Sequence, residues 1–257
     1  MKTLLLLLTL LLALPARAET LLVAAASDLS YCIDELGAAF SKEVPQAQLK
    51  VSTGASGNFF AQIRHGAPFQ VFLSADMDYP AQLARDGAAV GATLTPYAVG
   101  RIVLWTLDAR FDVQQGMRVF DDARLTRVAL ANPAVAPYGR AAKAALEAAG
   151  KWPALQPKLV IGENIAQAVQ FVQTGNAQIG IVSLASVVSP RLKGQGSYYL
   201  LPDAGMAPIV QGAIVTAQGK DNPLALRFVQ FLSSPAARAI LQRHGFGLPP
   251  APAAPRG

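Results

Sequence analysis

The sequence predicts an α/β fold of two lobes, each a mostly parallel sheet flanked by helices. Short apolar runs of strand length alternate with helical patterns along most of the chain, and this order is typical of parallel sheets covered by helices. The apolar runs are more numerous than one sheet comfortably holds. The roughly 240 residues that follow the N-terminal segment are enough for two modest lobes, each with its own core.

Each expected strand is a short apolar run, and each expected helix has apolar residues at a spacing of three or four positions. The expected strands are 21–25, 49–52, 71–73, 101–107, 127–131, 159–161, 179–182 and 209–216. The expected helices are about 29–41, 59–65, a helical stretch after Asp76, 139–149, 165–174, 222–232 and 235–244.

Two extended segments, 97–107 and 209–216, are the best candidates for crossings between the lobes. They divide the chain into a discontinuous first lobe, 19–98 with 216–247, and a second lobe, 99–215. The last ten residues, 248–257, are rich in Pro and Ala and have no periodic apolar face. We expect them to form a flexible tail.

The N-terminal segment, residues 1–18, has the pattern of a cleaved signal peptide. Lys2 precedes an apolar run, 4–14, and Ala16-Arg17-Ala18 fits the small-x-small cleavage rule. The run is short for a permanent membrane anchor, which is the alternative, and no Cys follows it as in a lipoprotein. We therefore expect an exported, periplasmic protein whose mature chain begins at Glu19 and contains no membrane-spanning segment.

Composition limits the partners of the mature chain. The full chain has 22 Lys+Arg and 16 Asp+Glu, so removal of Lys2 and Arg17 leaves a net charge of +4. No block of basic residues is present, so we expect no nucleic-acid partner. The one cysteine, Cys32, permits no internal disulfide, and stability must come from burial.

Signatures of catalysis are weak. The two histidines do not pair in sequence, and no His/Cys/Asp cluster has metal-ligand spacing. The segment Gly54-Ala55-Ser56-Gly57 lacks the pattern of a nucleophile elbow and the Lys of a phosphate-binding loop. A triad of Ser56, His65 and Asp76 has only its residue types in its favour. We expect no enzyme and no cofactor, with an exported serine hydrolase as the remote alternative.

Four expected strand-to-helix junctions carry small or hydroxyl residues. The first turn of a helix leaves backbone N–H groups without intrahelical partners, and the helix dipole adds partial positive charge there. Such a turn binds an anion without Arg or Lys, and in doubly wound sheets these turns lie where ligands bind. The four junctions are Ala25-Ala26-Ser27-Asp28, Thr53-Gly54-Ala55-Ser56-Gly57, Ala136-Pro137-Tyr138-Gly139 and Gly162-Glu163-Asn164-Ile165.

The same residues have an ordinary structural explanation. Ser27 and Ser56 are of the type that caps helices, and Pro137 with Gly139 is common in turns. Spacing alone does not show that the four junctions converge. The local chemistry permits an anion site and leaves the capping explanation open.

The segments AAASDL, TGASGNFFAQIRHGAPFQVFLSADM, NPAVAPYGRAAKAAL, GENIAQAVQFVQTGNAQIGIVSLASV and APIVQGAIVT occur in this order along the chain. Together they resemble the molybdate-binding proteins of bacterial ABC transporters. The resemblance covers nearly the whole mature chain and implies a periplasmic-binding-protein fold whose two lobes close over the anion. It implies a monomer that binds molybdate or tungstate and delivers it to a membrane permease with ATPase subunits. Sulfate or phosphate is the nearest alternative ligand.

The resemblance also implies site residues. Ser27 and Ser56 would donate from hydroxyl and backbone N–H groups, and Tyr138 and Ile165 from backbone N–H groups. Molybdenum would enter as the central atom of the oxyanion, held through its oxygens by the same residues. Asp28 stands where one branch of the family has an asparagine, so we expect its backbone N–H to donate and its side chain to turn away, as in a helix cap. Ser183 replaces a tyrosine of another branch and is a weaker candidate, acting through water.

Overall fold

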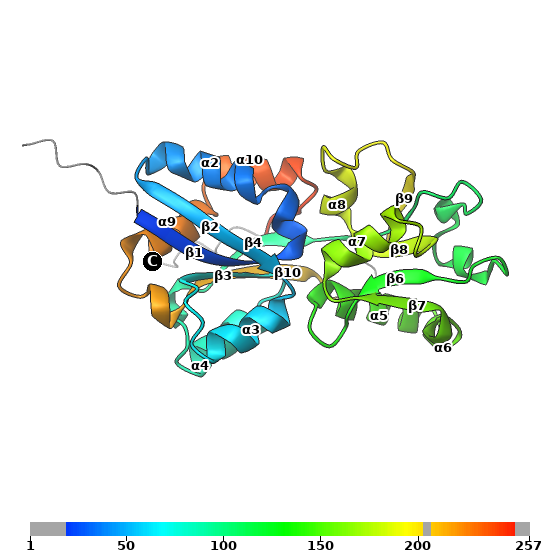
Figure 1. The fold of residues 1–257 in the computed structure, drawn as a ribbon, viewed down its shortest axis with the longest axis horizontal. Coiled ribbons are helices and arrows are strands. Elements are labelled where there is room, and N and C mark those ends of the chain that lie inside the picture. Colours follow the sequence, from blue (N-terminus) through cyan, green and yellow to red (C-terminus); the bar gives the residue numbers. More distant parts are fainter. Residues whose placement is uncertain (1–18, 203–206, 250–257) are drawn as a thin grey trace, which may run out of the picture.

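The computed structural model describes residues 19–202 and 207–249, which form two lobes side by side (Figure 1). The expected signal peptide, 1–18, and most of the expected tail, 250–257, lie outside the described residues. Those described form two five-stranded sheets, one in each lobe, with strand orders β2-β1-β3-β10-β4 and β7-β6-β8-β5-β9. The two-lobed α/β prediction is therefore confirmed.

The first lobe is built from both ends of the described chain. Its strands are β1 (Glu19–Ala26), β2 (Ala47–Gly54), β3 (Val71–Ser74), β4 (Thr95–Gly100) and β10 (Ile209–Val215). Its α-helices are α2 (Ile33–Glu43), α3 (Ser56–Arg64), α4 (Asp78–Arg85), α9 (Pro223–Phe231) and α10 (Pro235–Arg243). Short 3-10 helices are η1 (Ser27–Tyr31), η2 (Gly91–Thr93) and η5 (Ala217–Gly219).

The second lobe is one continuous stretch. Its strands are β5 (Ile102–Thr106), β6 (Val128–Ala131), β7 (Leu159–Gly162), β8 (Ile179–Ser183) and β9 (Ser197–Leu200). Its α-helices are α5 (Pro137–Ala148), α6 (Trp152–Leu155), α7 (Ile165–Gln173) and α8 (Leu184–Val188), with 3-10 helices η3 (Val113–Asp121) and η4 (Gln156–Lys158).

Alternation along β1 explains why the first sheet is covered on both faces. Successive side chains of a strand point to opposite faces. Leu21 and Val23 join the core that includes Phe40 of α2 and Phe228 of α9, whereas Ala24 joins the core beneath α3 and α4. Helices α2 and α10 accordingly lie on one face of the sheet and α3 and α4 on the other (Figure 1). Because both faces are buried, β1 reads as a continuous apolar run in the sequence.

The chain crosses between the lobes twice, and one crossing differs from the prediction. The segment 97–107 consists of two strands in different sheets, and the crossing lies at Arg101, between β4 and β5. The segment 209–215 was assigned to the second lobe, which is wrong. As β10 it pairs antiparallel with both β3 and β4, in the interior of the first sheet. The chain is therefore back in the first lobe at Ile209.

The start of α2 also differs from the prediction. The helix expected over 29–41 is preceded by the 3-10 helix η1, and the α-helix itself begins at Ile33. This tight turn places Ser27 and Asp28 directly at the end of β1. Among the residues that the structure describes, no helix combines the length and apolar character that a membrane crossing needs.

Candidate anion site between the lobes

The four junctions converge on one small cavity between the lobes. Two of them, η1 and α3, follow β1 and β2 of the first lobe, and the other two, α5 and α7, follow β6 and β7 of the second. The structure thus brings five of the predicted site residues together. The cavity is lined by Ala26, Ser27, Asp28, Gly54, Ala55, Ser56, Ala75, Ala136, Pro137, Tyr138, Asn164 and Ile165.

Three of these four helices have alanine at the N-cap position. Ala26 precedes η1, Ala55 precedes α3 and Ala136 precedes α5, and none of the three helices has a side-chain cap. Alanine cannot supply the oxygen that satisfies first-turn N–H groups. Ser27 and Ser56 are the first residues of their helices, not caps, so the capping explanation left open by the sequence is wrong for both.

The fourth helix, α7, has a side-chain cap, but this cap does not bind the N–H of its first residue, Ile165. The Asn164 side chain accepts from the N–H of Gln167, 3.1 Å away. The N–H of Ile165, like those of Ser56 and Tyr138, donates no hydrogen bond to the described residues. These three residues are 3%, 1% and 2% exposed. Buried N–H groups without acceptors are rare in proteins, so these three groups are free to donate to an acceptor from outside the described residues.

The hydroxyl of Ser56 is held ready to donate. Its Oγ accepts a hydrogen bond from the backbone N–H of Ala75 at 3.0 Å. Since that contact uses a lone pair of the oxygen, the hydroxyl proton remains available to an acceptor. Ser27, on the neighbouring junction, is 4% exposed and lines the same cavity.

Asp28 is fully buried at the junction of the lobes. Its Oδ2 accepts from the hydroxyl of Tyr138 at 2.8 Å and from Nε2 of Gln211 at 2.6 Å. Its side chain does not cap η1, so the expected helix cap is wrong. Burial, opposed by the hydrogen bonds from Gln211 and Tyr138, raises the pKa of the Asp28 carboxyl above its ordinary value.

The Asp28 contacts belong to a longer buried chain of hydrogen bonds. The hydroxyl of Tyr97 donates to Oε1 of Gln211 at 2.6 Å, and Nε2 of Gln211 also lies 3.1 Å from the Tyr138 hydroxyl. Burial raises the pKa values of both Tyr97 and Tyr138. Sequence reasoning missed Gln211 and Tyr97. The available signal was a glutamine inside the otherwise apolar strand Ile209–Val215.

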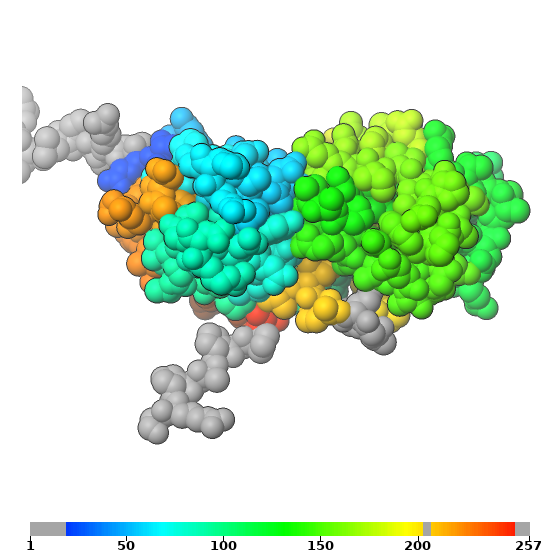
Figure 2. Space-filling model, turned by 90° about the horizontal axis from the view of Figure 1, so that it is seen from below, coloured from blue at the N-terminus to red at the C-terminus, as the bar shows by residue number. Residues whose placement is uncertain are grey.

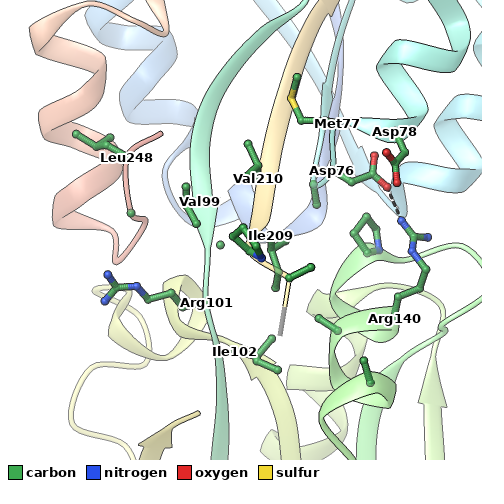
Figure 3. Close-up of a pocket in the computed structure, with 18 residues that line it drawn as sticks. Asp76, Met77, Asp78, Val99, Arg101, Ile102, Arg140, Ile209, Val210 and Leu248 are labelled. Carbon is green, nitrogen blue, oxygen red and sulfur yellow. Dashed lines mark hydrogen bonds and ion pairs between the residues drawn. The ribbon is translucent and has the colours of Figure 1, made fainter. Parts of the chain in front are cut away.

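Further contacts join the lobes around the cavity. Arg140 of α5 forms an ion pair with Asp76 and donates to the hydroxyl of Tyr79 at 3.2 Å, both in the first lobe. Figure 3 shows Arg140 reaching toward Asp76 between the lobes. Arg140 therefore pairs with residues of the opposite lobe.

Two more hydrogen bonds cross between α3 and the second lobe. The N–H of Gly57 donates to the carbonyl of Val135 at 2.8 Å, and Asn58 donates to Glu163 at 3.0 Å. The lobes accordingly meet along a closed seam on the face seen in Figure 2.

Ser183 lies outside the residues that line the cavity. Its Oγ accepts from the N–H of Ser186 at 3.2 Å and lies 2.6 Å from the Ser186 hydroxyl, at the start of α8.

The residues of the hypothetical triad are also apart. His65 ends α3, whereas Ser56 begins it, so the nine-residue helix separates them by roughly 13 Å. Within residues 19–202 and 207–249, no group of three or more His, Cys, Asp or Glu side chains forms a metal site.

A larger cavity of about 870 Å³ lies beside the crossing strands (Figure 3). It is lined by Val99 at the end of β4, by Arg101 at the first crossing, and by Ile209 and Val210 at the start of β10. Its wall is mostly apolar and includes the Asp76–Arg140 ion pair. Residue patterns did not indicate this cavity, and its lining includes none of the predicted donors.

Known proteins are similar to this chain in sequence and in fold. The molybdate-binding protein ModA of Azotobacter vinelandii is 38% identical over 238 residues, covering 93% of this chain and 94% of the relative. ModA of Rhodobacter capsulatus is 38% identical over 236 residues and 91% of each chain. The solved structure of the Azotobacter vinelandii periplasmic molybdate-binding protein has a TM-score of 0.84 at 32% identity, covering 89% of this chain and 99% of that one.

A more distant structure shares the fold alone. The sulfate-binding protein SubI from Mycobacterium tuberculosis has a TM-score of 0.73 at 13% identity, over 88% of this chain and 86% of its own. At the level of sequence, residues 21–247 match the family described as bacterial extracellular solute-binding protein. This chain belongs to the bacterial extracellular solute-binding protein family.

Proposed function

We propose that this chain captures molybdate, or tungstate, in the cavity between its lobes and delivers it to an ABC transporter. Ser27 and Ser56 donate from hydroxyl and backbone N–H groups, and Asp28, Tyr138 and Ile165 donate from backbone N–H groups. All of these donors contact oxygens, and none contacts the molybdenum. The names of the relatives that match over nine-tenths of the chain support this choice of anion.

The observation that carries the proposal is that three helices without a side-chain cap, each with alanine at its N-cap position, begin at one buried cavity. Their N–H groups need an acceptor, and the helix dipoles favour a negative one. Of the described residues that line the cavity, none is Lys or Arg. A neutral donor set avoids a fixed buried cation, which would be costly while the site is empty.

Capture follows from closure of the lobes. The first lobe supplies Ser27, Asp28 and Ser56, and the second supplies Tyr138 and Ile165, so an open form offers only two half-sites. The anion stabilises the closed form because all donors reach it only there. The hydrogen bond from Tyr138 to Asp28 and the ion pair from Arg140 to Asp76 add stability to the same closed form.

Sulfate and phosphate are the rival ligands on the same fold. Molybdate and tungstate have longer bonds to oxygen than sulfate, so discrimination rests on size. A cavity of rigid backbone donors leaves some of them unpaired around a smaller anion, and unpaired buried donors are costly. The site therefore favours the larger tetrahedral anions.

The same proposal includes a cellular setting. The chain is exported by the cleaved signal peptide 1–18, acts in the periplasm as a monomer, and presents its closed form to the permease. Binding alone suffices for this role, so no catalysis and no cofactor are needed. The separation of Ser56 from His65 supports binding over hydrolysis.

Isothermal titration calorimetry of residues 19–257 with molybdate, tungstate, sulfate and phosphate in parallel tests the proposal. We expect tight binding of molybdate and tungstate, and binding of sulfate and phosphate weaker by at least about a hundredfold, the equivalent of two or more unpaired donors. Tight sulfate or phosphate binding without molybdate binding would overturn the choice of ligand.

A further inference from the structure

Both side-chain hydrogen bonds to the Asp28 carboxyl reach the same oxygen. The Tyr138 hydroxyl and Nε2 of Gln211 donate to Oδ2. The other oxygen, Oδ1, is buried and has no hydrogen-bond partner among the residues that the structure describes. An ionised carboxylate accepts at both oxygens, whereas a neutral acid carries a proton on one of them. Because Oδ2 is occupied as an acceptor, the proton of the neutral acid belongs on Oδ1.

The surroundings of Asp28 favour the neutral acid. Burial is the largest influence on the pKa of the carboxyl, and it outweighs the hydrogen bonds from Gln211, Tyr138 and the backbone of Asp28 and Leu29, which lower that pKa. No Lys or Arg of the described chain adds to those opposing influences. The titratable groups that face it are Cys32 at the start of α2, Tyr97 on β4 and Tyr138 on α5. Burial raises the pKa of each of these groups, so all three are uncharged near neutral pH. Gln211 faces it from β10 and carries no charge.

Asp28 is also part of the wall of the anion cavity. A carboxylate beside a dianion in a buried site is strongly repelled, because the low dielectric weakens screening. A neutral acid in the same place is a donor, and an oxyanion oxygen is the acceptor that Oδ1 lacks. Oδ1 can therefore form a hydrogen bond with an oxygen of the anion only when Oδ1 carries the proton.

We propose that Asp28 is a specificity-determining residue, which enters the closed site as the neutral acid and donates its Oδ1 proton to an oxygen of the bound oxyanion. This rests on the function proposed above and adds a donor to it. No covalent bond other than that to the proton changes. In the open form Tyr138 has moved away with the second lobe, and Asp28 is ionised near neutral pH. One proton is therefore taken from the solvent for each anion captured, and the affinity for the anion falls as the pH rises.

Asparagine provides a matched comparison. In Asp28→Asn the amide oxygen takes the position of Oδ2 and accepts from Tyr138 and Gln211. The amide NH₂ takes the position of Oδ1 and donates to the anion. The variant therefore has a donor at the same position without a titratable proton. Any difference in proton uptake or in the pH dependence of affinity between the two proteins is then due to that proton.

The experiment is calorimetric titration of the mature protein with sodium molybdate between pH 6 and 9, in buffers of different ionisation enthalpy. For the wild-type protein we expect uptake of up to about one proton per anion and an affinity that falls by up to about tenfold per pH unit at the alkaline end. For Asp28→Asn we expect tight binding, no proton uptake, and an affinity constant that changes by less than about twofold between pH 6 and 9. Asp34→Asn, an exposed carboxyl on α2, should keep the wild-type profile.

A wild-type affinity that is independent of pH, with no proton uptake, would overturn the inference while leaving molybdate binding intact. A pH dependence that persists in Asp28→Asn would overturn it as well. The proton count of the wild-type protein decides the matter even where the variant does not fold. If the wild-type protein binds no molybdate at any pH, the proposed function fails first, and this inference fails with it.

Discussion

The hydroxyl of Tyr138, in the second lobe, lies 2.8 Å from Oδ2 of Asp28, in the first. The backbone N–H of the same tyrosine is one of the unpaired donors at the cavity. Under the proposed function, one residue therefore contributes to closure through its side chain and to anion binding through its backbone. A cross-lobe hydrogen bond to a carboxyl in this position stabilises the closed form relative to the open one.

Tyr138→Phe should separate these two contributions. The variant keeps the backbone N–H but loses the bond to Asp28, so we expect molybdate binding about tenfold weaker, from the usual 1–2 kcal/mol of such a bond. The loss should appear in the dissociation rate, measured by stopped-flow fluorescence, because the closed form opens more easily. Tyr199→Phe, on β9 of the second lobe, is the control. An unchanged dissociation rate in Tyr138→Phe would remove the side chain from the closing mechanism.

Ser56→Ala removes a hydroxyl at the wall of the cavity, which is a proposed anion donor and also accepts from the N–H of Ala75. Since both an anion contact and a buried acceptor are lost, we expect affinity to fall by about ten- to a hundredfold. Ser52→Ala, at an exposed position of β2, should bind like the wild type. Ester hydrolysis should be absent from all three proteins. Hydrolysis that disappears only in Ser56→Ala would support the hydrolase alternative.

Gly57→Ala tests closure by sterics. A Cβ at this position of α3 would lie 2.7 Å from the hydroxyl of Tyr79, the end of a side chain that can move within the same lobe. It would also lie 2.8 Å from the carbonyl oxygen of Val135 and 2.9 Å from its Cα, which are backbone atoms of the opposite lobe. Closure must then stop short, so we expect affinity to fall by more than about tenfold, as in other overpacked contacts. Small-angle scattering should show that molybdate no longer reduces the radius of gyration.

The control for Gly57→Ala is Gly91→Ala, whose Cβ would make an ordinary 3.5 Å contact with Ala84 inside the first lobe. Both variants should unfold at temperatures close to that of the wild type, because neither change alters the core of a lobe. A wild-type affinity in Gly57→Ala would show that the lobes bind the anion without meeting at this point.

Asp28 should also affect stability in the absence of anion. Its folded-state pKa is raised above the ordinary value of 3.8 by burial, so the folded protein holds the proton more tightly than the unfolded chain. Stability is then lost as the pH rises from about 3.8 toward the folded pKa. We expect the free energy of unfolding of Asp28→Asn to exceed that of the wild type at pH 7, with the gap narrowing toward pH 4. Urea unfolding at several pH values measures it, and Asp34→Asn should show no such trend.

Features that depend on neighbouring residues could be predicted from the sequence. Apolar spacing predicted most strands and helices, and small residues predicted the four junctions at 25–28, 53–57, 136–139 and 162–165. Their convergence needs the packing of two sheets. The resemblance to a known family implied it, but residue spacing did not.

Contacts between distant segments could not be predicted from spacing. Gln211 and Asp28 lie 183 positions apart, and Tyr97 and Gln211 lie 114 apart. Nothing in the pattern Ile209–Val215 indicates which sheet it joins, because a buried strand has the same apolar run in either lobe. The antiparallel pairing of β10 with β3 and β4 decides the question, and it is visible only in three dimensions.

The place of β10 has a consequence for how the molecule assembles. All five strands of the second sheet lie between Ile102 and Leu200, so that sheet can form as soon as those residues are available. The first sheet cannot form that early. Among the described strands β4 pairs with β10 alone, and β10 follows the whole second lobe in the chain. A nascent or translocating chain that ends before Ile209 therefore holds a finished second lobe and an incomplete first one. The first-lobe side of the proposed anion site is therefore complete only after β10 has inserted between β3 and β4.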